Sequence, residues 1–321
     1  MAGLIEQQIR TRASALLAEG RIDGFVGYRQ GSGPLRVAPF VARAPAEAEK
    51  LVWNPVCAPT LAGALRKHAG QRAGVALKAC DARSVAELLR LHQLDRERLY
   101  LIGVPCRGML DPEKVAAAAT GRVTSLAEEG AEVVIGVSGE TLRQERAALL
   151  LARCAGCQAA PTELFDEMLA EDAPMPPPGD RFAAVRALEA LAPAERLAFW
   201  QQHFSRCTLC YACQTVCPLC FCKECALALQ RDDPRRLARE PASVFAFHLM
   251  RAYHLAERCT GCDECERICP EDIPLSLICR KLELDRLEWC ANGDFTTEEA
   301  EGGGVRLEPR LYRRGRLDGS G

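Results

Sequence analysis

Hydrophobic positions in the first half of the chain alternate between a helical and a strand-like period. Apolar residues from Leu4 to Leu17 recur at helical spacing on one face, and Gly20 follows as a stop signal. Two strand-like runs, 24–28 and 35–41, are separated by a turn and predict a β-hairpin. The pattern then predicts a helix over 61–68, a strand over 74–78, a helix over 83–91, a strand over 99–104, a helix over 113–118 and a buried strand over 133–137. This alternation predicts an α/β domain with a partly parallel sheet over residues 1–158.

The second half has a different pattern. Residues 171–180 contain four prolines and cannot form a helix or a central strand, which predicts a surface connection. Helices are predicted over 182–191 and 194–204, and residues 159–200 are assigned to the connection and its helices. A further helix over 244–256 belongs to a predicted, mainly α-helical domain at residues 201–290. The tail, residues 291–321, is acidic, then glycine-rich, then arginine-rich, and is predicted to be irregular.

Composition narrows the class of protein. The 321 residues have room for about two domains, and a net charge of −2 gives no electrostatic reason to expect a nucleic-acid partner. The first residues lack the apolar core of a signal peptide, and no uncharged apolar run approaches a membrane span. We therefore predict a cytoplasmic protein without direct membrane insertion. Eighteen cysteines in a reducing compartment indicate metal ligands.

Two cysteine strings share the spacing C-x2-C-x2-C-x3-C-P. The first consists of Cys207, Cys210, Cys213 and Cys217, and the second of Cys259, Cys262, Cys265 and Cys269. This is the ligand run of a [4Fe–4S] cluster in which the fourth cysteine binds the other cluster. It predicts a 2[4Fe–4S] ferredoxin domain with crossed ligation, in which one cluster takes Cys207, Cys210, Cys213 and Cys269 and the other takes Cys259, Cys262, Cys265 and Cys217. Structural zinc or disulfides are the alternatives, but zinc sites usually use pairs of C-x2-C.

Seven of the other cysteines suggest further metal sites. Cys220, Cys222 and Cys225 directly follow the first string and predict an additional metal site, unless one or two of them pack as small apolar residues. Cys154 and Cys157 form a C-x2-C after a helix-like run over 143–153, which by itself also fits half a zinc site or a redox dithiol.

Cys80 and Cys106 each follow a predicted strand. Cys80 precedes Asp81, which we expect to cap the next helix. Ligands in open α/β sheets bind at the carboxyl ends of strands. We therefore predict that Cys80, Cys106, Cys154 and Cys157 hold a third [4Fe–4S] cluster, with ligand exchange with the 220–225 group as a variant. Cys279 is predicted to lie in the core, and Cys57 and Cys290 have no assigned role, although either could complete the 220–225 group.

Other catalytic signatures are missing from the sequence. No complete G-x-G-x-x-G follows a strand, and neither a Ser–His–Asp set nor a carboxylate pair stands out. The five histidines lack metal spacing, and His248 and His254 are predicted to pack or lie on the surface of a helix.

Several segments together resemble a known family. They are KACDARSVAELLRLHQLDRERLYLIGVPC, RCAGCQAAPTELFD, FSRCTLCYACQTVCPLCFCKEC and FHLMRAYHLAERCTGCDECERICPEDIPLSL. Over roughly residues 15–285 the chain resembles the beta-subunit family of coenzyme F-420-reducing hydrogenases and formate dehydrogenases. The similarity points to the bacterial branch found with heterodisulfide-reductase-like complexes.

The resemblance implies an α/β domain of the flavin-binding type that holds FAD, with iron–sulfur clusters beside it. By matching positions, Lys78, Cys80, Asp81, Cys106 and Gly108 lie around the flavin or its neighbouring cluster. The chain departs from the better-known archaeal members, which carry their ferredoxin segment before the flavin domain.

These observations predict an oxidoreductase subunit that is catalytic only within a complex. It passes electrons between a soluble electron carrier and a partner redox subunit of the formate dehydrogenase, hydrogenase or heterodisulfide-reductase type. The alternative is a non-enzymatic, polyferredoxin-like adaptor subunit without flavin. A third hypothesis is a redox sensor or thiol–disulfide enzyme that uses Cys154 and Cys157. This function would require a thioredoxin-like unit around the two cysteines.

Overall fold

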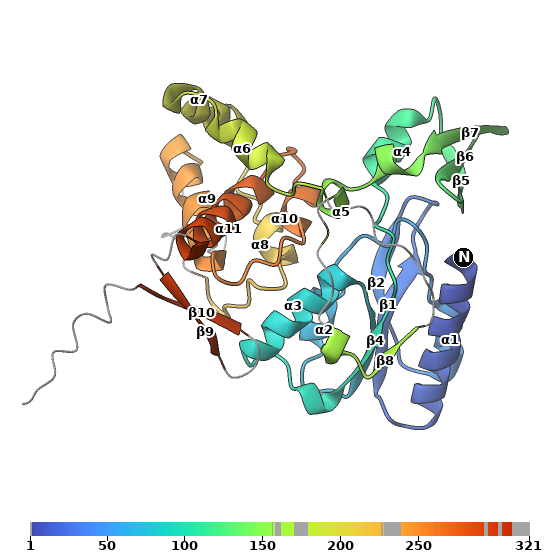
Figure 1. Cartoon of the computed structure of the whole chain (residues 1–321). Helices are drawn as coiled ribbons and strands as arrows, with labels where there is room; N and C mark the ends of the chain where they lie inside the picture. Colours follow the sequence, from blue (N-terminus) through green and yellow to red (C-terminus); the bar gives the residue numbers. More distant parts are fainter. Residues whose placement is uncertain are drawn as a thin grey trace, which may run out of the picture. The chain divides into compact units, whose positions relative to one another are not determined.

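A computed structural model of the chain describes residues 2–155, 157, 162–169, 179–225, 227, 239–291, 295–300 and 304–309. It divides into two compact units (Figure 1). The first consists of Met1–Leu88 and His92–Arg181, and the second of Leu89–Leu91 and Phe182–Gly321. The helices expected in the connecting region therefore belong to the second unit. Most of the proline-rich stretch, residues 170–178, lies outside the described residues.

The first unit is built on a five-stranded sheet, which confirms the predicted α/β class with a partly parallel sheet. The strand order is β2 (Val37–Ala42), β1 (Gly24–Gln30), β3 (Ala73–Leu77), β4 (Leu99–Gly103) and β8 (Glu167–Met168). The last four are mutually parallel, and β2 pairs antiparallel with β1, which confirms the predicted hairpin. All five residues of β3 are buried, as expected for a central strand between two parallel neighbours.

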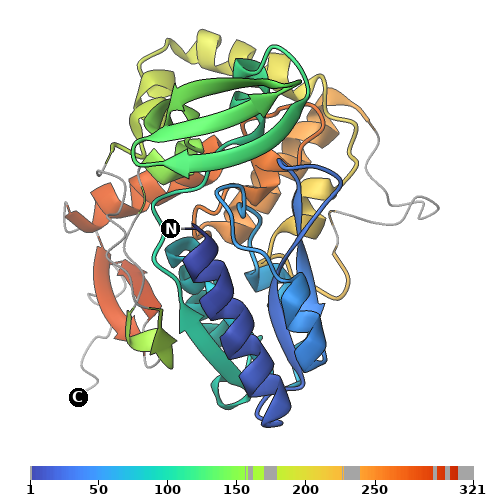
Figure 2. The same ribbon diagram turned by 90° about the vertical axis from the view of Figure 1, so that its right-hand side faces the viewer.

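Helices cover the sheet where the hydrophobic pattern predicts them. Helix α1 (Ala2–Ala18) buries the face that carries Ile5, Ile9, Ala13 and Leu16. Helices α2 (Ala62–Lys67) and α3 (Ala79–Arg90) flank β3 in the chain. Figures 1 and 2 show α1 on one face of the sheet and α3 on the other. Helix α4 (Pro112–Ala118) begins where the Asp111 side chain accepts a hydrogen bond from Glu113 N.

A second, antiparallel sheet follows α4. It consists of β5 (Val123–Glu129), β6 (Glu132–Val137) and β7 (Glu140–Glu145). The strand predicted at 133–137 is therefore real but does not belong to the parallel sheet. Gly130 and Gly139 have positive φ angles of 65° and 97° and occupy the two hairpin turns, where glycine is favoured.

The helix predicted over 143–153 is wrong. The segment contains the end of β7, a 3₁₀ turn (Arg146–Leu149) and the short helix α5 (Ala152–Ala155). The physical reason is that Leu142 pairs across the sheet with Ile135, while Leu149 is buried in the core beneath this sheet. Tertiary packing thus outweighs a helix-like composition.

The second unit is mainly helical, as predicted. Its helices are α6 (Ala183–Glu189), α7 (Pro193–Phe204), α8 (Ala212–Val216), α9 (Pro241–Leu255), α10 (Glu264–Arg267) and α11 (Ser276–Ala291). Phe204, Leu209, Val244, Phe247 and Ile273 form its main core, against which several of the string cysteines pack.

The tail departs from the prediction that it is irregular. Strands β9 (Phe295–Ala300) and β10 (Gly304–Pro309) pair antiparallel. Their mixed Thr, Glu and Arg composition hides the alternation of a strand, while the glycine run between them suits a turn. The remaining tail residues lie outside the described part. Within that part, no helix is both long enough and apolar enough to cross a bilayer.

Arg146 ties the second sheet to the loop after β4, and this contact yields a stability prediction. Its buried guanidinium donates to Glu128 at 2.5 Å and to the carbonyls of Arg107 and Gly108 at 2.7 Å each.

Arg146→Met should lower the free energy of unfolding by about 3–5 kcal/mol because a half-buried carboxylate and two carbonyls lose their partner. Arg143→Met, which removes exposed pairs with Glu129 and Glu132, should cost less than about 1 kcal/mol. Urea unfolding of both variants measures the difference, and equal costs would contradict the role of Arg146.

Candidate functional site

The two cysteine strings adopt the same backbone conformation. Leu209 and Tyr211 in the first string have positive φ angles of 50° and 60°. At the matching positions of the second string, Gly261 and Asp263 have φ angles of 63° and 53°. Alternating left- and right-handed residues turn successive N–H groups toward one concave side, a conformation found at many iron–sulfur sites. Helices α8 and α10 follow directly and carry the third cysteine of each string.

Backbone amides bond the first thiol of each string in the same way. Leu209 N donates to Cys207 Sγ at 3.4 Å. The backbone of Gly261 makes the matching hydrogen bond to Cys259. Such bonds favour the thiolate, because an amide stabilises the charged form of the sulfur.

The eight thiols come together in two mixed sets. Burial raises the pKa of Cys207, and the nearby thiols of Cys269 and Cys210 raise it further. Burial likewise raises the pKa of Cys213 to about 11, with the same neighbours adding to it. Cys269 thus lies with three cysteines of the other string. In the second set, a single cavity is lined by Cys217, Cys259, Cys262 and Cys265. The spacing predicts these same groupings as the ligand sets of two clusters, and that ligation stays a prediction.

A buried cation lies among the thiols. Arg251 on α9 is 4% exposed, and its Nη2 donates to Cys213 O at 2.9 Å. Burial lowers the pKa of Arg251, but the thiols of Cys265, Cys213, Cys217 and Cys220 outweigh it and raise the pKa well above its usual value. Arg251 therefore remains a guanidinium and offsets the negative charge of the surrounding sulfurs.

His248, one turn before Arg251, faces the first set. Its ring is 3% exposed, and Nε2 lies 3.3 Å from Cys207 Sγ. Burial, with Arg251 nearby, lowers the pKa of His248 to about 4. From the sequence, only a packing or surface role is predicted for His248, because nothing in its spacing indicates a neighbouring thiol.

The three cysteines that directly follow the first string, Cys220, Cys222 and Cys225, have described side chains. Cys220 donates a hydrogen bond to Cys217 and lowers the pKa of the Cys217 thiol. Cys222 is exposed and Cys225 is half-buried. The metal site predicted for this group stays a prediction. In the described part of the chain, no three His, Cys, Asp or Glu side chains are close enough to hold one metal ion.

Cys279 on α11 is buried, as predicted, but it does more than fill the core. It lines the cavity of the second set and shares a side-chain hydrogen bond with Cys259. The apolar run around it conceals this contact in the sequence. The side chain of Cys290 lies outside the described residues.

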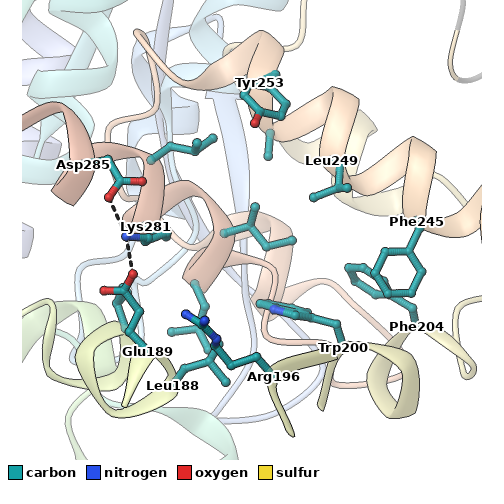
Figure 3. Close-up of a pocket in the computed structure, with 15 residues that line it drawn as sticks. Leu188, Glu189, Arg196, Trp200, Phe204, Phe245, Leu249, Tyr253, Lys281 and Asp285 are labelled. Carbon is teal, nitrogen blue, oxygen red and sulfur yellow. Dashed lines mark hydrogen bonds and ion pairs between the residues drawn. The ribbon is translucent and has the colours of Figure 1, made fainter. Parts of the chain in front are cut away.

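An apolar cavity of about 330 Å³ lies elsewhere in the second unit (Figure 3). It is lined by residues of α6, α7, α9 and α11, and Phe245, Leu249 and Tyr253 follow one another along α9. Phe204, on its wall, stacks on His248 at 4.6 Å. Lys281 on α11 bonds both Glu189 and Asp285 at the rim.

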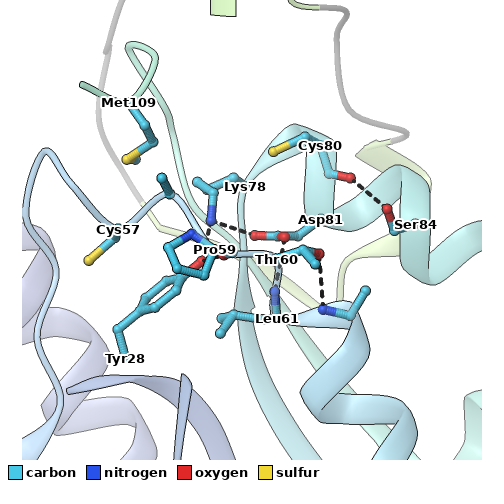
Figure 4. Close-up of polar contacts among 12 residues, drawn as sticks. Tyr28, Cys57, Pro59, Thr60, Leu61, Lys78, Cys80, Asp81, Ser84 and Met109 are labelled. Atoms are coloured by element: carbon cyan, nitrogen blue, oxygen red, sulfur yellow. Dashed lines mark hydrogen bonds and ion pairs between the residues drawn. The ribbon is translucent and has the colours of Figure 1, made fainter. Parts of the chain in front are cut away.

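In the first unit, a buried ion pair lies at the carboxyl end of β3 (Figure 4). Lys78 and Asp81 are 1% and 0% exposed, with Nζ and Oδ2 2.6 Å apart. Lys78 also donates to the Tyr28 hydroxyl, and that hydroxyl lies 2.5 Å from Pro59 O. Burial lowers the pKa of Lys78, but Asp81, Cys80 and Cys106 outweigh it and raise the pKa, so the side chain remains an ammonium.

Asp81 does not cap the helix, contrary to the prediction. Helix α3 begins at Ala79, so Asp81 lies in its first turn. Its carboxylate instead accepts from Leu61 N at 3.1 Å and pairs with Lys78. The Asp81 carboxylate pairs with the buried ammonium instead of capping the helix, because an unpaired buried charge costs several kcal/mol.

Each of the four thiols predicted to form the third site lies near at least one of the other three. Burial raises the pKa of Cys106 to about 12, and the nearby thiols of Cys80 and Cys154 contribute. Burial also raises the pKa of Cys157, and Cys154 adds to it. Met109 N donates to Cys154 Sγ at 3.3 Å. The structure thus brings together residues from α3, the loop after β4, α5 and the segment that follows α5.

Gly108 lies in that loop with a φ angle of 91°, which favours glycine. Its carbonyl accepts from Arg146 and its backbone bonds Cys106. Cys57, also buried, has a thiol pKa raised to about 12 by burial, and its Sγ accepts from Asn54 N at 3.3 Å. Tyr28 and Arg251 are site residues that the sequence did not single out, and His248 and Cys279 are site residues for which the sequence predicted no role at the site.

Comparison with known proteins relates most of the chain to subunits of redox enzymes. A family model described as a 4Fe-4S dicluster domain matches residues 204–273. The chain is 25% identical to F420-dependent formate dehydrogenase subunit beta of Methanocaldococcus jannaschii, over 84% of this chain and 86% of the relative. It is 24% identical to F420-dependent formate dehydrogenase 1 subunit beta of Methanococcus maripaludis, over 84% and 85%.

A structure of the F420-reducing [NiFe] hydrogenase complex from Methanosarcina barkeri matches 50% of this chain and 61% of that chain, with a TM-score of 0.39 at 16% identity. The resemblance inferred from the sequence is confirmed by the two dehydrogenase subunits. The chain is thus similar to the F420-dependent formate dehydrogenase beta subunits along 84% of its length, and its residues 204–273 match a 4Fe-4S dicluster domain.

Proposed function

We propose that the chain is an iron–sulfur and flavin subunit that moves electrons between a soluble carrier and a partner redox subunit of an oxidoreductase complex. The observation that carries the proposal is that string cysteines lie near one another in two groups, each with members of both strings. The sequence similarity to formate dehydrogenase beta subunits supports the proposal that the chain is one subunit of a larger complex.

The two sets suit two [4Fe–4S] clusters. Cys207, Cys210, Cys213 and Cys269 would hold one, and Cys217, Cys259, Cys262 and Cys265 the other. The fit rests on the donor chemistry: four thiols to each set, amides that bond the sulfurs, and the Arg251 guanidinium as a counter-charge.

The first unit supplies the other end of the proposed electron path. Cys80, Cys106, Cys154 and Cys157 would hold a third cluster, and Lys78, Asp81 and Gly108 would lie near FAD. The support is the buried Lys78 ammonium at the carboxyl end of β3, where ligands of open α/β sheets bind. When bound, FAD exchanges two electrons at once and the clusters pass them singly. Lys78, fixed by Asp81 and Tyr28, would offset negative charge on the nearby thiolates and the flavin.

Crossed ligation predicts which cysteine variants lose the same cluster. Cys217→Ala and Cys262→Ala should each remove the second cluster, whereas Cys269→Ala and Cys210→Ala should each remove the first. Each variant should lose about four irons, the content of one tetranuclear cluster. Electron paramagnetic resonance of the reduced, anaerobically purified variants identifies the signal that remains. The idea fails if Cys217→Ala and Cys210→Ala lose the same signal.

Cofactor content separates the proposal from the adaptor alternative. The wild-type chain, purified anaerobically, should contain one FAD and about twelve irons, the sum of three tetranuclear clusters. Cys106→Ala should lower the iron to about eight, as expected for two remaining clusters. Cys57→Ala, which removes a buried thiol bonded to Asn54, is the matched control and should keep the full iron content. A wild-type chain without flavin and with only about eight irons would instead support the polyferredoxin-like adaptor.

A further inference from the structure

His248 is a buried polar side chain whose ring nitrogen is aimed at a sulfur of the first cysteine set. It lies on the buried face of α9 with Val244, Phe247 and Arg251. Nε2 is 3.3 Å from Cys207 Sγ, a distance within hydrogen-bond range for sulfur. The motif that defines the dicluster domain contains no histidine, so this contact needs its own explanation.

Aromatic neighbours on two sides fix the orientation of the ring. Phe204 on α7 stacks on it, with ring centroids 4.6 Å apart and an interplanar angle of 16°. Phe247 meets it edge-on at 4.9 Å and 68°. Both phenylalanines are buried, at 3% and 1% exposed. Packing therefore holds Nε2 toward the sulfur, and no other hydrogen bond of this ring is found among the described residues.

The chemistry of the pair decides where the proton lies. A cysteine that binds iron does so as a thiolate, which can only accept a hydrogen bond. Nδ1 of His248 is buried without a hydrogen-bond partner among the described residues. The proton of the neutral imidazole therefore belongs on Nε2, where it has an acceptor.

The matching position in the second string has a different donor. Cys259 corresponds to Cys207, and its side-chain partner is the thiol of Cys279. When Cys259 binds iron, only Cys279 can donate in that pair. A thiol is a weak donor, whereas an imidazole N–H is a strong one. The two otherwise similar strings thus differ at this contact.

We propose that His248 is a positioning residue that sets the first cluster, held by Cys207, Cys210, Cys213 and Cys269, at a higher reduction potential than the second. The inference rests on the cluster ligation proposed above. One-electron reduction adds negative charge that is shared by the cluster and its sulfurs, and no proton needs to move. The Nε2–H bond stabilises the more negative state, since hydrogen bonds to the sulfurs are among the factors that set cluster potentials. An electron shared between the two clusters would then reside mainly on the first.

Redox titration of the anaerobically purified full chain, followed by electron paramagnetic resonance, tests this proposal. His248→Phe keeps an aromatic ring beside Phe204 but removes the donor. It should shift the midpoint potential of one cluster to more negative values, by a fivefold to tenfold change in the one-electron equilibrium, equivalent to about 40–60 mV. The other cluster should keep its potential. His248→Gln retains an amide donor and should shift the same cluster less.

Cys279→Ala is the matched control at the second string and should shift the other cluster by a smaller amount. If His248→Phe leaves both potentials unchanged, or if His248→Phe and His248→Gln shift the same cluster equally, the proposal is wrong. If His248→Phe loses iron, His248→Met, which also lacks an N–H donor, replaces it in the comparison. The iron content of the wild-type chain tests the proposed clusters independently of the role of His248, because that value does not depend on any His248 variant.

Discussion

The second unit depends on how it accommodates eight thiols within a small helical fold. A thiolate removed from water is costly unless a donor, a cation or a metal faces it. The strings meet this requirement with amides turned inward at left-handed residues, such as Leu209 and its counterpart Gly261. Helix α9, which lies between the strings in the sequence, adds the Arg251 guanidinium and the His248 imidazole from one buried face. The long insert between the strings is therefore part of the site.

The first unit also buries thiols, but there the nearby positive charge comes from a lysine at the end of a strand. Its thiols gather at the carboxyl ends of β3 and β4, and the counter-charge is the Lys78 ammonium, itself fixed by Asp81. Removal of either partner of such a buried pair leaves an uncompensated charge, which costs several kcal/mol. Arg146 then anchors the loop that carries Cys106 and Gly108 to the antiparallel sheet. The fold thus holds Cys80 and Cys106, from two parts of the chain, near one fixed positive charge.

Sequence patterns predicted the helices and strands in which buried residues recur at one constant spacing. The alternation up to β4, the hairpin of β1 and β2, and helices α7 and α9 were predicted within a few residues. The segment at 143–153 was misjudged because its first residues belong to β7, which is a strand through its partner strands and not through its own composition. The repeat of cysteine spacing predicted the two mixed sets, since the spacing itself encodes the loop geometry. The sequence did not predict the roles of His248, Arg251 and Cys279 at the site, because these roles arise only when α9 and α11 pack against the strings, and single-sequence patterns carry no such contacts.

The proposed function depends most on crossed ligation, in which the two strings exchange their fourth cysteines between two [4Fe–4S] clusters. Crystals of the full chain, grown without oxygen and measured at the iron absorption edge, locate the iron atoms directly by anomalous scattering. The account predicts two four-iron centres in this domain, one bound by Cys207, Cys210, Cys213 and Cys269 and the other by Cys217, Cys259, Cys262 and Cys265. Two centres each bound by the four cysteines of a single string, or single zinc ions in their place, would contradict it.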